Sequence, residues 1–88
     1  MSNSNIRDML LVAPEGQMDE PLKDIIRKFD VEPTAVQLLE ALDNATYFAS
    51  ASGFVVSVLA TLFEKKPQGE KDEAIKYANL NWRKEYSK

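Results

Sequence analysis

The sequence of 88 residues contains neither histidine nor cysteine. The chain therefore has no imidazole base, no thiolate nucleophile, no disulfide and no nitrogen or sulfur ligand for a zinc or copper ion. The acidic residues that cluster at 19–24 and 70–73 fall in the first turns of predicted helices, where the helix dipole stabilises negative charge. We therefore predict a protein that is not an enzyme and that uses no cofactor and no metal.

Glycine and proline are scarce, with three and four residues respectively, and they divide the chain into segments of helical length. No segment shows the strict alternation of apolar and polar residues that is typical of a strand. The predicted fold is an all-α single domain over residues 1–88, a compact bundle of about five short helices. The expected helices span residues 4–12, 19–29, 33–49, 53–65 and 70–88.

Charged residues are absent from Asn44 to Phe63, a run of 20 residues. Residues 53–65 are apolar on nearly every side, which predicts a helix at the centre of the bundle. A single-pass membrane protein with residues 44–63 as the span is an alternative, because Lys65 and Lys66 follow the run as the positive-inside rule requires. The interruption at residues 50–53 and the four other amphipathic segments, which need an apolar partner, favour the buried helix and make a membrane partner unlikely.

The net charge is -3, and it is unevenly distributed. Residues 1–45 carry nine acids and four bases, whereas residues 64–88 carry seven bases and five acids. This excess of bases is too small for a typical nucleic-acid surface, so we expect nucleic-acid binding to be unlikely. That alternative would depend on the bases of the last third of the chain, which are Lys65, Lys66, Lys71, Lys76, Arg83, Lys84 and Lys88. The first residues resemble no secretory signal, and we expect a cytoplasmic protein.

The last predicted helix carries the strongest candidate for a binding surface. Trp82, Arg83 and Tyr86 belong to the residue types that are enriched at binding hot spots. The predicted partner-binding residues are Tyr77, Trp82, Arg83, Lys84 and Tyr86. Core packing is the alternative for Trp82 and Tyr86, because they share a helical stripe with Ile75 and Ala78.

Tyr47 and Phe48, beside the small residues 50–53, form a second candidate surface that could support a dimer. Together these features predict a small non-enzymatic helical adaptor or regulator, of a kind frequent among phage and accessory proteins. It would bind a protein partner, which the sequence does not identify, through the last helix or the flank of residues 53–65. We expect that such an adaptor can act as a homodimer.

Overall fold

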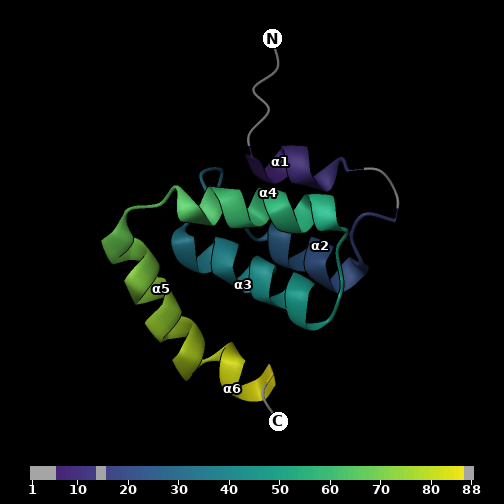
Figure 1. Ribbon diagram of the computed structural model, residues 1–88. Coiled ribbons are helices and arrows are strands. Elements are labelled where there is room, and N and C mark those ends of the chain that lie inside the picture. Colours follow the sequence, from purple (N-terminus) through teal and green to yellow (C-terminus); the bar gives the residue numbers. More distant parts are fainter. Residues whose placement is uncertain (1–5, 14–15, 87–88) are drawn as a thin grey trace.

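The computed structural model describes residues 6–13 and 16–86, and these residues form six α-helices (Figure 1). The helices are α1 (Ile6–Leu11), α2 (Glu20–Arg27), α3 (Ala35–Tyr47), α4 (Gly53–Glu64), α5 (Gln68–Leu80) and α6 (Trp82–Tyr86). Over these residues there is no strand, only an isolated antiparallel bridge between Met18 and Ala51. The prediction of an all-α bundle is confirmed.

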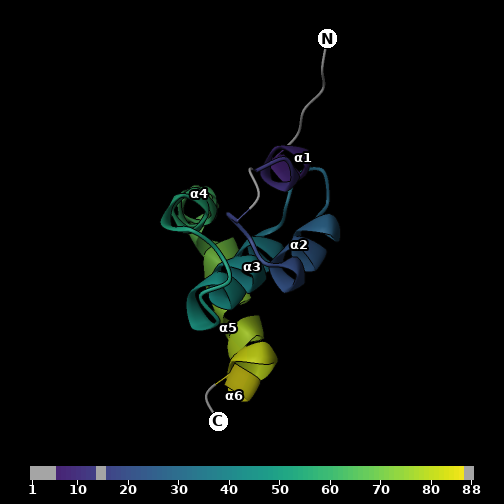
Figure 2. The same cartoon turned by 90° about the vertical axis from the view of Figure 1, so that its right-hand side faces the viewer.

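Helix α3 lies at the centre of the bundle, where it packs against α2, α4 and α5 (Figures 1 and 2). The apolar character of residues 53–65 predicts that segment at the centre, and this prediction is wrong. Instead α4 buries only one side, and its Phe54 side chain is 70% exposed. Small buried residues such as Ala41 and Ala45 let neighbouring helices approach α3 from several directions, whereas Ser57 and Thr61 of α4 face water. The core residues are Leu10, Met18, Leu22, Ile26, Phe29, Ala35, Leu38, Leu39, Ala41, Ala45, Val55, Leu59, Phe63, Ala74 and Ala78.

The start of α3 is fixed by a capping box. The Thr34 hydroxyl accepts a hydrogen bond of 3.1 Å from the backbone N–H of Gln37, and the Gln37 side chain accepts one of 3.1 Å from the backbone N–H of Thr34. Two donors that the first helical turn leaves unpaired are thereby satisfied. The predicted helix start at Pro33–Thr34 is confirmed.

The uncharged run of residues 44–63 is divided between two helices. Helix α3 ends at Tyr47, and Ala49 has a positive φ of 52°. The Ser50 hydroxyl donates a 2.8 Å hydrogen bond to the Asn44 side chain, and Ser52 caps α4. The predicted interruption at residues 50–53 is therefore confirmed. Among the described residues, no helix combines the length and the apolar character needed to cross a membrane.

The predicted helix over residues 70–88 is two helices in the part that the structure describes. Asn81, with φ -116° and ψ -97°, separates α5 from α6, and its side chain donates a 2.7 Å hydrogen bond to the carbonyl of Tyr77. Side chains such as Asn favour these local hydrogen bonds over a helical continuation. The break turns α6 toward the C-terminal half of α3, where its side chains meet those of Asp43 and Tyr47.

Candidate functional site

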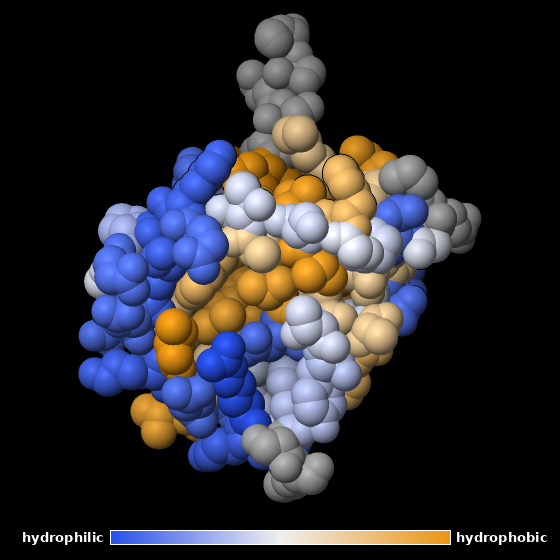
Figure 3. Space-filling view, viewed as in Figure 1, coloured by the Kyte–Doolittle hydropathy of each residue, from blue (hydrophilic) through white to orange (hydrophobic). Residues whose placement is uncertain are grey.

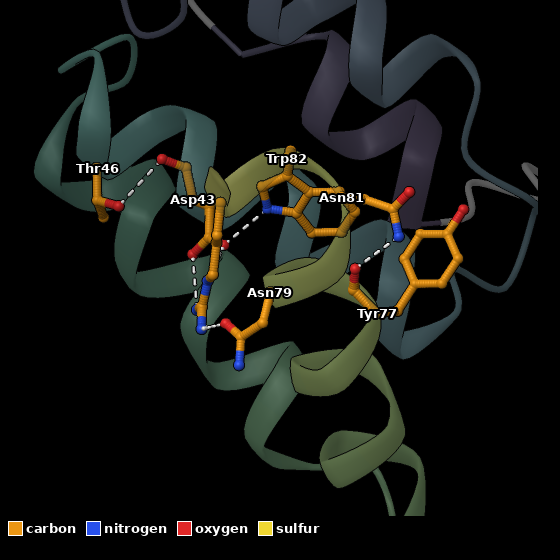
Figure 4. Close-up of polar contacts among 7 residues, drawn as sticks. Asp43, Thr46, Tyr77, Asn79, Asn81 and Trp82 are labelled. Atoms are coloured by element: carbon orange, nitrogen blue, oxygen red, sulfur yellow. Dashed lines mark hydrogen bonds and ion pairs between the residues drawn. The ribbon is translucent and has the colours of Figure 1, made fainter. Parts of the chain in front are cut away.

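Asp43 of α3 receives three hydrogen bonds from α6, and we call Asp43, Trp82 and Arg83 the Asp43 junction (Figure 4). The Asp43 Oδ2 atom accepts from the indole Nε1 of Trp82 at 2.8 Å and from Nε of Arg83 at 2.7 Å. The Oδ1 atom accepts from Nη2 of Arg83 at 3.2 Å. The Asp43 side chain is only 15% exposed, so these charge-assisted bonds are partly shielded from water. The junction fixes α6 on α3.

The hydrogen bond with Asp43 raises the pKa of the Arg83 guanidinium above its ordinary value, although burial acts in the opposite direction. Arg83 therefore stays fully charged, and its planar fork matches the two carboxylate oxygens. The same guanidinium donates from Nη1 to the Asn79 side chain of α5 at 3.3 Å. Arg83 thus links α3, α5 and α6 at one point.

Three aromatic rings pack together beside the Asp43 junction, and we call Tyr47, Phe48 and Tyr86 the aromatic cluster. The Tyr47 and Tyr86 rings are stacked with centroids 5.0 Å apart. Phe48 meets both rings edge to face, at 4.9 Å from Tyr47 and 5.2 Å from Tyr86. These geometries are favourable for aromatic pairs. The side chains of Tyr47 and Phe48 remain 53% and 55% exposed, so the cluster presents a large apolar surface to water.

A hollow of about 570 Å³ opens between α3, α5 and α6. Its lining residues are Asp43, Thr46, Tyr47, Asn79, Arg83 and Tyr86. The two tyrosine rings supply apolar walls. The Thr46 hydroxyl donates to the Asp43 carbonyl at 3.2 Å and can still accept a hydrogen bond, and the Asn79 amide nitrogen can donate one, while its oxygen accepts from Arg83. The hollow therefore suits a side chain from another molecule, with an apolar body and a polar tip.

The predicted binding residues occupy different environments in the structure. Trp82 is half-buried and packs against the edge of the core, and Arg83 is occupied by Asp43 and Asn79. Tyr86 joins the aromatic cluster. Tyr77 is exposed with its ring 5.9 Å from that of Trp82, and Lys84 is exposed. Trp82, Arg83 and Tyr86 therefore hold α6 against α3, whereas Tyr77 and Lys84 lie at the surface.

Sequence reasoning did not identify Asp43 as a site residue, because it lies off the apolar stripe of its helix. The structure instead buries most of its side chain under α6. One signal was present: Asp43 has no basic residue three or four positions away to pair with on its own helix. Trp82 and Arg83, which are adjacent in the sequence, both carry N–H groups that need hydrogen-bond acceptors. The sequence also left Tyr47 and Phe48 as a surface separate from Tyr86, whereas the structure joins all three.

Ionisation of Tyr86 is expected to destabilise the protein in alkali. Burial raises the pKa of its phenol, the charges of Glu40 and Asp43 raise it further, and a hydrogen bond with Asn44 opposes the shift. The contribution of the protonated Tyr86 to the free energy of unfolding is complete below the pKa of the unfolded chain, about 10. It is lost as the pH rises through the higher pKa of the folded protein. Denaturant unfolding of the wild type and of Tyr86→Phe, measured from pH 8 upward, should show a steeper alkaline loss for the wild type. Parallel curves would contradict a role for this phenol.

The basic residues of the last third do not all remain available to phosphates. Lys71 lies 3.1 Å from the carboxylate of Glu64, and Arg83 is held in the Asp43 junction. Lys88 lies outside the described residues. The bases of this set that are exposed among the described residues are Lys65, Lys76 and Lys84.

No family model, no curated protein and no solved structure matches the chain. Within residues 6–13 and 16–86, no group of three or more acidic side chains is placed to hold a metal ion. The site consists of exposed aromatic rings around a hollow and of the ion pair between Asp43 and Arg83, which fixes α6 on α3. This arrangement is suited to recognition of another macromolecule.

Proposed function

We propose that the chain is a small, non-enzymatic, cytoplasmic adaptor or regulator that binds a protein partner through the aromatic cluster. The observation that carries this proposal is the exposure of Tyr47 and Phe48, each more than half exposed, beside a hollow of about 570 Å³. Tyrosine and tryptophan are enriched at binding hot spots because they bury a large area with few rotatable bonds. Exposed apolar surface around a hollow is typical of interaction sites.

The rings are held in place before any partner arrives. Tyr86 stacks on Tyr47, and the three hydrogen bonds of Asp43 keep α6, and with it Tyr86, on α3. A preorganised surface loses less side-chain entropy when it binds, so a larger share of the contact energy appears as affinity. The Asp43 junction therefore acts as a positioning element for the aromatic cluster.

The hollow restricts the chemistry of the partner. A partner segment would insert an aromatic or branched aliphatic side chain against Tyr47 and Tyr86, with a polar atom toward Thr46 or Asn79. Lys84 is exposed on the same short helix, but it is two positions from Tyr86 and therefore lies on the other side of α6, outside the hollow. Tyr77 is exposed beside Trp82, but it projects from the side of α5 opposite to Asn79 and therefore lies outside the contact made at the hollow (Figure 4).

Capture from a cell extract tests the proposal with a matched pair of variants. Phe48→Ala removes an exposed side chain from the aromatic cluster, and Val31→Ala removes one of similar exposure, 57%, from the loop between α2 and α3. We expect the wild type and Val31→Ala to retain the same protein in equal amounts, and Phe48→Ala to retain at least about tenfold less, as for a hot-spot residue. Equal retention by all three chains would contradict the proposal.

A further inference from the structure

Helix α4 carries an apolar surface on the side that faces away from α3. The α4 face, as we call it, consists of Phe54, Ser57, Val58, Thr61 and Leu62, which line a shallow hollow of about 230 Å³. A second hollow of about 230 Å³ lies between α4 and α1, and it adds Ile6, Met9 and Leu10 to this surface. Figure 3 shows hydrophobic surface on both sides of α4. Phe54 is 70% exposed, and an exposed apolar surface of this kind is typical of a contact site.

We propose that the α4 face binds a second copy of this chain, with the two α4 helices antiparallel around a twofold axis. A twofold axis places the same patch of each copy against itself, and a residue that lies on the axis meets its own copy, so a charge at the centre of the patch would meet its own like. Residues 53–63 contain no charged side chain, and this patch therefore satisfies the requirement in a chain of net charge -3. A second copy can use the face without electrostatic cost.

The spacing of the side chains fits such a pairing. With the twofold axis near Val58, Phe54 of one copy lies opposite Leu62 of the other, because both are four positions from Val58. Ser57 and Thr61 are small and let the two helices approach closely. Each Phe54 ring would then enter the hollow that Val58 and Leu62 line on the other copy, as a knob enters a hole.

Charges beyond the two ends of α4 favour the antiparallel orientation. Asp19 lies beyond the N-terminal end, where its backbone N–H donates a 2.8 Å hydrogen bond to the carbonyl of Ser50. Lys65 directly follows the C-terminal end. Antiparallel helices bring the N-terminal end of one copy to the C-terminal end of the other, so Asp19 and Lys65 of different copies approach at both ends. Parallel helices would bring like charges together.

The dimer would leave the aromatic cluster accessible, because α6 lies at the end of the molecule away from α1 and α4 (Figures 1 and 2). Two copies would then present two aromatic clusters to a multivalent partner. The α4 face and the aromatic cluster share no residue, so a substitution can abolish the dimer without affecting partner binding, or partner binding without affecting the dimer.

Sedimentation velocity over a range of concentrations tests the proposal with two matched variants. Thr61→Glu places a charge on the α4 face, and Thr46→Glu makes the same change at an exposed position beside the aromatic cluster. We expect a wild-type dimer and an increase of more than about tenfold in the dimer dissociation constant of Thr61→Glu, because each copy would place an unpaired charge in an apolar interface. Thr46→Glu should dimerise as the wild type does. Circular dichroism verifies that each variant is folded.

A charge exchange tests the orientation. Asp19→Lys and Lys65→Asp should each weaken the dimer by about threefold to tenfold, and the double variant should restore it. A failure to restore would overturn the antiparallel arrangement. A wild type that is monomeric up to about 1 mM would overturn the dimer, as would dissociation by Thr46→Glu but not by Thr61→Glu. A monomer that binds phosphatidylcholine vesicles through Phe54 would assign the face to a membrane surface and would also overturn it.

Discussion

Replacing Asp43 by alanine is expected to lower the free energy of unfolding by about 2 kcal/mol and to release α6 from α3. The substitution removes the acceptor of three hydrogen bonds and leaves the indole N–H of Trp82 without its partner. The Arg83 side chain is 38% exposed, so water compensates part of its loss. Alanine is also the better helix former, which reduces the measured loss.

Urea denaturation followed by circular dichroism measures this loss. The fluorescence of Trp82, the only tryptophan, should shift to longer wavelength in Asp43→Ala before the other helices unfold. Asp43→Asn is the control: it keeps an oxygen acceptor but removes the charge, and about half of the loss is expected. Unchanged stability and emission in Asp43→Ala would show that the junction does not hold α6.

The fold was predictable wherever a local signal determined the structure. Pro33 and Thr34 start α3, and the small residues 50–53 interrupt the uncharged run, as the sequence indicated. Capping and turn preferences act over a few residues, so they can be recognised without tertiary information. The all-α class follows from the same local patterns.

The arrangement of the helices was less predictable. Residues 53–65 are more apolar than the third helix, yet α3 occupies the centre because its small residues permit close packing on several sides. The break at Asn81 also escaped prediction, since the acidic start and basic end of residues 70–88 fit one continuous helix. Hydrophobicity along the chain therefore did not determine which helix would be surrounded.

The candidate site was predicted only in part. The residue types at 82–86 indicated a binding surface, but their partners on α3 are 39 and 40 positions away. Contacts at this separation depend on how α5 crosses α3 and on where the chain turns at Asn81. The composition of a helix cannot supply that geometry, so the sequence did not connect Asp43 and Tyr47 with α6.

Loss of Tyr47 and Phe48 together is expected to raise the dissociation constant for the captured partner by at least about 100-fold. The two rings supply the most exposed part of the aromatic cluster, and their removal leaves Tyr86 without its stacking neighbour. Because both side chains are more than half exposed, the double variant should remain folded, with a loss of about 1 kcal/mol or less.

Isothermal titration of the purified partner into wild type, Tyr47→Ala/Phe48→Ala and Phe54→Ala provides the most direct test. Phe54→Ala removes an exposed aromatic ring from α4, outside the aromatic cluster, and should leave the affinity per site unchanged. The account predicts equal binding by the wild type and Phe54→Ala and a loss of at least about 100-fold in the folded double variant. Wild-type affinity in the folded double variant would contradict the proposal that the aromatic cluster binds the partner.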